Sequence, residues 1–494
     1  MLLDGVTLDS RRVRHGDLYA AMPGARAHGA DFAADAASAG AAAVLTDADG
    51  ASRAAATGLP LLVAPDPRAV LGRAAAWVYG EPAASMLLVG VTGTNGKTTT
   101  THLLDAALRR LGRITGLVGT ITTRVGDTTV PSVRTTPESP DVHALLAVMA
   151  ERGVQVCSME VSSHALALHR VDGLVFDVAV FTNLSQDHLD FHGDLETYFA
   201  VKASLFTPER SRRAIVCVDD EWGRRLARQA GVPVVSLATH EGADADWRVT
   251  DPDAGASGAT TAFDLHGPAG QHLHLISPMP GAFNVTNTAL AALVLMDAGV
   301  APGEVVRALA LAEGVPGRME RVQSTSGNES LVDEPLAVVD YAHTPDAVAA
   351  AIAALRPSTP GRLVVVLGAG GDRDAGKRAA MGAAAAAGAD LVVVTDDNPR
   401  SEAPQAIRAA VLAGARSAEH PGPRPVDVVE VPDRAEAVLA AVRAAPTRGD
   451  TVLVAGKGHE QGQETGGRTT PFDDREVLRR ALETVADERA EVDL

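Results

Sequence analysis

The chain has 494 residues, of which 46% are hydrophobic, and its 62 acidic and 44 basic side chains give a formal net charge of -18. This length exceeds what one hydrophobic core fills and predicts about three domains. The acidic balance argues against a nucleic-acid partner or an anionic membrane surface, because both require a basic face. The first residues lack a signal-peptide pattern and no apolar run approaches bilayer length. We therefore expect a cytoplasmic protein without membrane insertion. We also expect a monomer, although no sequence feature determines the oligomeric state.

Cysteine and lysine are both scarce. Cys157 and Cys217 lie in apolar runs, which predicts buried free thiols rather than a disulfide or metal ligands. Only four of the 44 basic residues are lysine. A sequence that uses arginine almost everywhere is expected to keep lysine where a compact, deprotonatable amine is needed. The four positions are Lys97, Lys202, Lys377 and Lys457.

Residues 1–84 are predicted to form a small α/β domain. Apolar runs at 41–45 and 61–63 alternate with alanine-rich helical patterns. The stretch from Leu8 to Arg11, which includes Ser10, stands out, although on chemistry alone it is equally consistent with a polar turn. A linker is expected at Glu81 and Pro82.

Residues 85–315 begin with a phosphate-binding pattern. The apolar run 86–91 predicts a strand, a glycine turn follows, and Lys97 and Thr98 open a helical pattern. In this context backbone N–H groups and a helix N-terminus face the anion, Lys97 reaches the outer phosphates, and Thr98 offers its hydroxyl to Mg²⁺. Val91 replaces the usual first glycine. The predicted ATP- or GTP-binding residues are Gly93, Thr94, Asn95, Gly96, Lys97, Thr98 and Thr99.

The remainder of this region alternates strands and helices, which is typical of a doubly wound parallel sheet. Ligands bind at the carboxyl ends of such strands, so Glu160 and His188, which follow two apolar runs, are candidate Mg²⁺ ligands. The spacing of His188, Asp190 and His192 is also compatible with zinc, but an adjacent ATP loop favours a hard, oxygen-ligated ion. Lys202 lies in a helical stretch. Its amine either reaches the surface or, as the scarcity of lysine favours, performs chemistry.

Residues 316–494 repeat the pattern of an apolar run followed by a polar motif, at 336–339, 363–367, 391–394 and 452–454. The arrangement is Rossmann-like. Arg373 occupies the position of the last glycine of a G-x-G-x-x-G fingerprint, so we do not expect an NAD site.

Taken in order, these motifs resemble the ATP-dependent Mur ligases of peptidoglycan precursor synthesis, and among them the members that add the third residue of the peptide. The resemblance extends over the whole chain. It is carried by residues 8–11, 93–98, 135–137, 160–164, 169–170, 187–190, Lys202, 281–284, 317–320, 340–343, 397–400 and 456–460.

The resemblance implies a three-domain α/β architecture and a reaction. Residues 1–84 would bind a UDP-N-acetylmuramoyl dipeptide, residues 85–315 ATP, and the Rossmann-like residues 316–494 an incoming amino acid, meso-diaminopimelate. ATP would phosphorylate the dipeptide carboxylate, and the amino group would attack the acyl phosphate. The product would serve cell-wall synthesis, and with it cell shape and division.

The resemblance also implies residue roles. Lys202 would take up CO₂ and, as a carbamate, join Thr98, Glu160 and His188 as a metal ligand, and the catalytic set would be Lys97, Glu160, His188 and Lys202. Asn284, Arg318 and Asp340 would hold the nucleotide. The dipeptide would contact Leu8, Ser10, Thr135, Thr136, Ser162 and Arg170.

The amino-acid site is predicted from the strand ends of the last domain. Arg400 offers two parallel donors to the distal carboxylate of diaminopimelate, and Glu460 can pair with its ammonium group. Lysine lacks that carboxylate. The full predicted set is Arg373, Asp397, Asn398, Pro399, Arg400, Gly456 and Glu460.

Departures from the family pattern and competing interpretations remain. The uridine-contacting segment, expected at residues 25–27, is not reproduced, and Arg134 and Leu168 replace other residues found in some members. A lysine-adding synthetase is disfavoured by Arg400, and a folylpolyglutamate synthetase by residues 8–11. A P-loop regulator or motor would leave the motifs of residues 316–494 unexplained.

Overall fold

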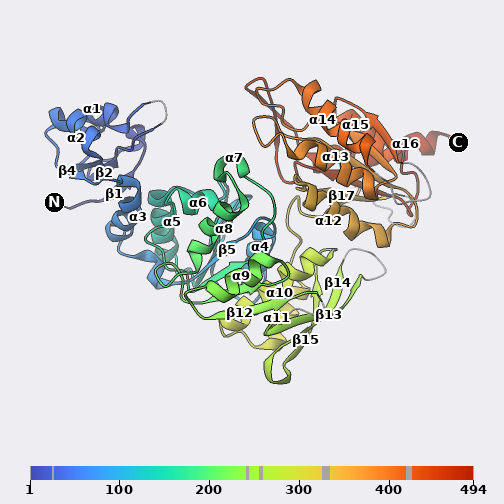
Figure 1. Cartoon of the computed structure of the whole chain (residues 1–494), viewed down its shortest axis with the longest axis horizontal. Helices are drawn as coiled ribbons and strands as arrows, with labels where there is room; N and C mark the ends of the chain where they lie inside the picture. The colour runs from blue at the N-terminus through green and yellow to red at the C-terminus, as the bar shows by residue number, and fades with distance from the viewer. Residues whose placement is uncertain are drawn as a thin grey trace.

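The structure is a computed structural model that describes residues 2–24, 27–240, 244–254, 260–324, 334–418 and 426–492. Three α/β units follow one another along the chain, each built on its own sheet (Figure 1). Residues 25 and 26 of the expected uridine-contacting segment lie outside the described residues. No helix within the described ranges combines the length and hydropathy needed to cross a bilayer.

The N-terminal unit is a four-stranded parallel sheet with strands in sequence order. The predicted runs at 41–45 and 61–63 form its third and fourth strands. Side chains alternate across the sheet, so that Leu18 and Leu45 face one core and Tyr19 and Val44 face another. Its elements are β1 (Gly5–Thr7), β2 (Asp17–Ala20), α1 (Ala33–Ser38), β3 (Ala43–Thr46), α2 (Ala48–Ala54), β4 (Leu61–Val63) and α3 (Pro67–Val78).

The central unit contains an eleven-stranded sheet in the order β15-β14-β13-β12-β11-β10-β5-β9-β6-β7-β8. Its middle strands, from β12 to β6, pair in parallel as predicted. Antiparallel strands that the sequence analysis did not predict extend both edges. The strands are β5 (Leu87–Thr92), β6 (Thr115–Val118), β7 (Thr122–Val125), β8 (Thr128–Pro131), β9 (Val156–Glu160), β10 (Val178–Phe181), β11 (Ala214–Cys217), β12 (Val234–Ala238), β13 (Trp247–Ala254), β14 (Thr261–His266) and β15 (His272–Ser277).

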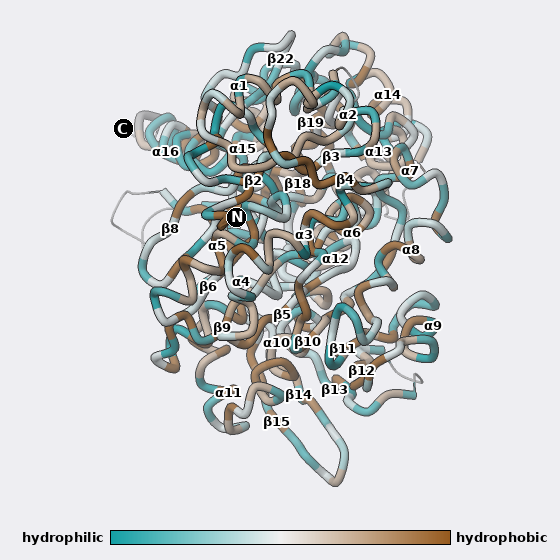
Figure 2. The backbone as a smooth tube through the Cα atoms, turned by 90° about the vertical axis from the view of Figure 1, so that its left-hand side faces the viewer, coloured by the Kyte–Doolittle hydropathy of each residue, from teal (hydrophilic) through white to brown (hydrophobic). Residues whose placement is uncertain are grey.

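Helices cover both faces of the parallel strands, which explains why those strands are apolar along their whole length. Val89 and Val91 pack toward α4 (Lys97–Arg110), α10 (Ala282–Asp297) and α11 (Pro302–Ala310). Leu88 packs on the other side, where the covering helices are α5 (Ser139–Glu151), α6 (Ser163–Ala167), α8 (Leu195–Ala203) and α9 (Glu221–Gln229). Cys157 and Cys217 are buried and free, as predicted. The β14–β15 hairpin forms the lower end of the molecule in both views (Figure 1, Figure 2).

The C-terminal unit has a six-stranded sheet in the order β16-β17-β21-β18-β19-β20, parallel except for β16. The four predicted runs form β17, β18, β19 and β21. The strands are β16 (Glu320–Val322), β17 (Leu336–Asp340), β18 (Leu363–Leu367), β19 (Leu391–Val394), β20 (Asp427–Glu430) and β21 (Thr451–Ala455). One face is covered by α12 (Pro345–Leu355), α13 (Lys377–Gly388) and α14 (Pro404–Ser417), and the other by α15 (Arg434–Arg443) and α16 (Asp474–Val492). A small hairpin joins β22 (Gly462–Thr465) to β23 (Arg468–Pro471).

Candidate active site

The phosphate loop connects β5 to α4 through two glycines at which a side chain would be strained and would clash with neighbouring side chains. Gly93 and Gly96 have φ values of 143° and 91°. A Cβ at Gly93 would lie 1.9 Å from Thr182 Oγ1, and one at Gly96 would lie 2.4 Å from Asn287 Oδ1. The loop is therefore held tightly against neighbouring elements, and the N-terminus of α4 opens toward a cavity.

That cavity has a volume of about 720 Å³ and lies between the central and C-terminal units. Strand ends of both sheets contribute to its walls, as expected for ligand sites of parallel sheets. The predicted residues that line it are Thr94, Asn95, Gly96, Lys97, Thr98, Thr99, Thr135, Glu160, Ser162, His188, Lys202, Arg318, Asp340, Arg373, Asp397, Asn398, Arg400, Gly456 and Glu460.

Two lysines meet below the phosphate loop. The Nζ atoms of Lys97 and Lys202 donate to the same acceptor, Gly93 O, at 2.9 and 2.7 Å. Lys202 is 1% exposed and its Nζ also lies 4.5 Å from the centre of the Tyr198 ring. Burial, followed by the positive charge of Lys97, lowers the pKa of Lys202 well below its usual value. The Lys202 side chain thus has the environment of a neutral amine.

Glu160 and Thr98 lie together at the ends of β9 and the phosphate loop. The fully buried Glu160 carboxylate accepts hydrogen bonds from Thr98 Oγ1 at 2.9 Å and Thr120 Oγ1 at 3.0 Å, and from Thr120 N at 2.7 Å. A carboxylate and a hydroxyl form the oxygen-rich donor set that Mg²⁺ prefers. The sequence analysis missed Thr120, which follows the end of β6 by two residues, because it did not identify the short run 115–118 as a strand.

His188 lines the cavity with its Nε2 3.4 Å from Asp187 Oδ2. Burial lowers the pKa of His188 to about 4, with Asp187 acting in the opposite direction, so the ring is neutral near pH 7 and keeps a lone pair. The zinc alternative is not supported: among the described residues, His188, Asp190 and His192 do not converge as three donors. Instead, His192 Nε2 lies 2.9 Å from Ser163 Oγ.

Two of the three predicted nucleotide-contacting residues, Arg318 and Asp340, line the cavity. Arg318 reaches from the C-terminal unit to Thr98 Oγ1 at 3.2 Å and lies 4.3 Å above the Tyr341 ring. Asp340 accepts a hydrogen bond from Met319 N at 2.7 Å, and burial raises the pKa of its carboxyl. Asn284 is buried and donates to Pro280 O at 2.8 Å, so its amide is held by the segment that precedes α10. Asn287, one turn later, lines the cavity instead.

In the C-terminal unit, a buried lysine holds the end of β19 and the loop after β21 together. Lys457 Nζ lies 3.4 Å from Asp397 Oδ1 and 3.3 Å from Glu460 Oε2. It also donates to Asn398 Oδ1 at 3.0 Å, and Asn398 Nδ2 donates to Glu460 Oε2 at 2.7 Å. Glu460 was predicted to pair with a substrate ammonium group, and in the structure it already has Lys457 as a partner.

Arg400 and Arg373 line the same end of the cavity. Arg400 has a φ of 54°, and its guanidinium donates to Gly371 O at 2.6 Å and lies 3.6 Å from Glu464 Oε2. Arg373 donates to Asp372 O at 3.1 Å. Pro399 does not line the cavity. Its carbonyl accepts from Glu402 N at 3.1 Å and so shapes the turn that carries Arg400.

A second cavity of about 1030 Å³ lies between the N-terminal and central units. Leu8 and Ser10 line it together with Arg134 and Glu138. Because Arg134 lines this groove and Thr135 lines the cavity at the phosphate loop, one segment connects the two spaces.

The remaining predicted residues support that segment from behind. Thr136 is buried and donates to Glu160 O at 2.8 Å. Arg170 pairs with Glu138 Oε1 at 2.9 Å and donates to Thr136 O at 3.4 Å. Thr136 and Arg170 thus fix the segment rather than forming the cavity walls.

Lys377 was noted only for being a lysine, yet it lines the cavity. Its Nζ, at the start of α13, lies 3.8 Å from Asp187 Oδ1 in the central unit. The scarcity of lysine was the one sequence signal that marked this position.

These features define a three-unit P-loop enzyme. Its phosphate loop lines one end of a cavity, and Arg373 and Arg400 line the other. Family models match along the chain: "Mur ligase family, catalytic domain" at residues 3–79, "Mur ligase middle domain" at 91–295, and "Mur ligase, glutamate ligase domain" at 317–458. The chain belongs to the Mur ligase family of ATP-dependent ligases.

Individual relatives agree with this assignment. The chain is 55% identical over 481 residues to the UDP-N-acetylmuramoyl-L-alanyl-D-glutamate--2,6-diaminopimelate ligase of Streptomyces avermitilis, covering 97% of this chain and 92% of that protein. It is 49% identical to the UDP-N-acetylmuramyl-tripeptide synthetase of Leifsonia xyli, covering 97% and 91%. A solved structure of a UDP-N-acetylmuramoyl-L-alanyl-D-glutamate--2,6-diaminopimelate ligase superposes with a TM-score of 0.68 at 31% identity, covering 98% of this chain and 95% of that one.

Proposed function

We propose that this chain joins meso-2,6-diaminopimelate to UDP-N-acetylmuramoyl-L-alanyl-D-glutamate at the expense of ATP, in the cytoplasmic synthesis of peptidoglycan precursors. The proposal is supported by the names of relatives that match nearly the whole chain. The observation that carries it is the single cavity that contains the phosphate loop, Lys202 and Arg400. The product would enter the cell wall and so support cell shape and division.

The two cavities suggest how the substrates are divided among the units. Residues 1–84 would hold the UDP end of the dipeptide in the groove of Leu8 and Ser10. Residues 85–315 would bind ATP, and residues 316–494 the amino acid. The segment containing Arg134 and Thr135 leads from the groove toward the phosphate loop, which is the path that a peptide attached to a nucleotide sugar would need to follow.

In the reaction that we propose, the dipeptide carboxylate attacks the γ-phosphorus of ATP, an acyl phosphate forms and ADP leaves. The amino group of diaminopimelate then attacks the acyl carbon, phosphate leaves and an amide remains. Lys97, once released from Gly93 O and Thr94 O, and the N-terminus of α4 would bind the transferred group. Arg318, which reaches Thr98 from the opposite unit, would neutralise developing charge on the phosphate oxygens.

The residues at the loop fit Mg²⁺. Thr98 and Glu160 would supply oxygen ligands, and His188, neutral near pH 7, a nitrogen ligand. When bound, the ion neutralises phosphate charge and polarises the phosphorus–oxygen bonds. Thr120 holds the Glu160 carboxylate in place through two hydrogen bonds.

Lys202 would act as a carbamate that adds a second anionic ligand to the phosphate site. Formation of a carbamate requires an uncharged amine, and burial of Lys202 supplies it. The modification would also turn a buried amine beside Lys97 into an anion, which the charge of Lys97 favours.

At the opposite end of the cavity, Arg400 would bind the distal carboxylate of diaminopimelate with two parallel donors. Asp397 and Asn398, fixed by Lys457, would position the amino end of the same substrate. Glu460 retains acceptor capacity beside Lys457, because a carboxylate accepts several hydrogen bonds.

The proposal is tested by ADP release from the purified chain with ATP, Mg²⁺ and the UDP-muramoyl dipeptide. Diaminopimelate should produce rapid release, whereas lysine or no amino acid should produce little. Equal rates with lysine would identify a lysine-adding synthetase. Undiminished ADP release without dipeptide and amino acid would contradict a ligase function altogether.

A further inference from the structure

The outer face of the β14–β15 hairpin, far along the chain from the phosphate loop, carries a second group of metal-binding side chains. Asp264 and His266 lie two residues apart on β14, and His272 and His274 two residues apart on β15. The strand register pairs Asp264 with His274 and His266 with His272. Directly opposed residues have Cβ atoms about 4.5–5.5 Å apart, so all four side chains share one patch of the sheet.

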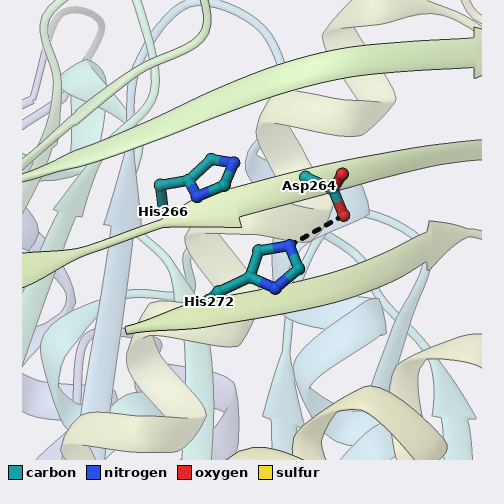
Figure 3. Close-up of side chains that lie close together, drawn as sticks. All are labelled: Asp264, His266 and His272. Atoms are coloured by element: carbon teal, nitrogen blue, oxygen red, sulfur yellow. Dashed lines mark ion pairs between the residues drawn. The ribbon is translucent and has the colours of Figure 1, made fainter. Parts of the chain in front are cut away.

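A ring nitrogen of His272 faces the Asp264 carboxylate (Figure 3), and the His266 ring lies against the His272 ring with centroids 4.8 Å apart. One ligand atom from each of Asp264, His266 and His272 lies within 4.8 Å of the others. His272 Nε2 is 3.0 Å and His274 Nδ1 is 2.9 Å from Asp264 Oδ1. The edge of a tetrahedral zinc site with bonds near 2 Å measures roughly 3.3 Å, close to the His272–Asp264 separation.

The surroundings of this group favour a bound cation. His266 Nε2 lies 3.0 Å from Thr250 Oγ1, so a proton placed on Nε2 leaves the other ring nitrogen with a lone pair. Metal-binding imidazoles usually have such a partner for their second nitrogen. The arginine paired by register with His266, Arg248, is directed to Asp244 at 3.3 Å and does not compensate the Asp264 carboxylate.

We propose that Asp264, His266 and His272 form a surface site for a late first-row divalent cation such as Zn²⁺, with His274 as a positioning residue that orients the Asp264 carboxylate. Two imidazoles and one carboxylate match the nitrogen- and oxygen-ligated sites of Zn²⁺, in which water occupies the fourth position. Mg²⁺ and Ca²⁺ require more oxygen ligands than this face offers. The site is separate from the Thr98 and Glu160 oxygens proposed for Mg²⁺.

A bound ion would connect β14 and β15, the last two strands at one edge of the central sheet. The outward histidines are exposed, with His272 at 50% and His274 at 64%, and Asp264 is partly exposed, so these side chains can close around an ion without disturbing the core. The inward residues Leu265, Leu273 and Leu275 are buried and keep the hairpin backbone in place. The cation would therefore bind to a preformed surface, and the fold would not depend on it.

The test is equilibrium dialysis of the chelator-treated full chain against Zn²⁺, in excess Mg²⁺ to occupy oxygen-rich sites. The wild-type chain should bind one more Zn²⁺ than each of Asp264→Asn, His266→Gln and His272→Gln. His274→Gln and Thr250→Val should retain the site with affinity reduced roughly 10- to 100-fold. Titration with Co²⁺ should give the strong visible absorption of a four-coordinate ion in the wild-type chain and not in Asp264→Asn.

His15→Gln is the matched control, because it removes an exposed imidazole from the N-terminal unit. It should bind as many Zn²⁺ ions as the wild-type chain. Unfolding midpoints without metal and ligase activity should be the same in all variants, which separates this proposal from the proposed function. Equal Zn²⁺ stoichiometry and affinity in the wild-type chain and the three ligand variants would overturn it.

Discussion

Two of the four lysines are buried, one on each side of the cavity at the phosphate loop, and they differ in whether carboxylates surround the amine. Lys202, in the central unit, donates to the backbone carbonyl of Gly93, and no described carboxylate lies within ion-pair distance of it. Lys457, in the C-terminal unit, lies between Asp397 and Glu460. The two residues are 1% and 0% exposed, so burial alone does not distinguish them.

The difference shows that the partners of a buried amine decide its chemistry. A buried lysine without an anion loses its proton easily, because the low-dielectric interior penalises its charged form. A lysine between two carboxylates pairs with both and fixes their geometry. We therefore interpret Lys202 as a reactive group and Lys457 as the support of the amino-acid site.

The largest expected effect concerns the Lys457 side of the cavity. If Arg400 recognises the distal carboxylate of diaminopimelate, lysine should be used roughly 10⁴-fold less efficiently, because its binding leaves the guanidinium unpaired. Arg400→Ala should sharply lower kcat/KM for diaminopimelate and change the poor use of lysine little. Steady-state kinetics with both amino acids measure this. Unchanged discrimination between diaminopimelate and lysine in the variant would show that Arg400 does not recognise the distal carboxylate.

On the phosphate side, Lys97→Ala should reduce ligation by roughly 10³-fold, since a positioned charge on the transferred phosphoryl group is lost. ATP turnover by the wild-type chain should require Mg²⁺, the dipeptide and diaminopimelate together. Product formation followed by chromatography measures both effects. Ligation at the wild-type rate in the variant would show that Lys97 does not bind the transferred group.

Lys202→Arg tests the reactive amine directly. Arginine keeps a positive charge but forms no carbamate, so Lys202→Arg should lose as much activity as Lys202→Ala, roughly 10²-fold or more, as for loss of one charge-stabilising group. Intact-mass spectrometry at neutral pH in bicarbonate should show the added CO₂ on the wild-type chain only. An active arginine variant would contradict the carbamate.

Replacing each lysine by methionine compares their contributions to stability. Lys457→Met leaves the nearly buried Asp397 without its cation and should lower the free energy of unfolding by about 3 kcal/mol, at the low end for a broken buried pair because Glu460 is partly exposed. Above about pH 10.5, where the amine is neutral in both the folded and the unfolded chain, Lys202→Met loses one hydrogen bond and should cost only about 1 kcal/mol. Urea denaturation measures both. Equal costs would show that the two environments do not differ energetically.

The comparison also predicts a dependence of stability on pH. Because the pKa of Lys202 is lower in the folded chain than in the unfolded chain, its contribution to stability is complete above about pH 10.5 and declines as the pH falls toward the folded-state pKa. In CO₂-free buffer, the stability of the wild-type chain relative to Lys202→Met should thus rise between pH 7.5 and 10 by up to about 1.4 kcal/mol per pH unit. A flat difference would mean that Lys202 stays protonated when buried.

Sequence reasoning succeeded where a short segment carries its own signal. The apolar run before Gly93 formed β5, and Lys97 opened α4 as the turn chemistry predicted. Glu160 lined the cavity because the end of a parallel strand is recognisable from its apolar run. The nucleotide contact predicted for Asn284 stays a prediction: Asn287 lines the cavity, and its Nδ2 donates to Asn284 Oδ1 at 3.2 Å on the same face of α10.

The sequence by itself determined the elements that local periodicity encodes: the strands, the phosphate loop and the polar residues that follow each strand. Only the tertiary structure decided which of these residues meet, because contacts between distant segments depend on how sheets pair and units pack. Lys202 reaches Gly93 across 109 positions, and Arg318 reaches Thr98 across 220. The pairing of β14 with β15 that brings His266 and His272 together is by contrast local, because the two strands form a hairpin, and it was missed because the sequence analysis did not identify these strands.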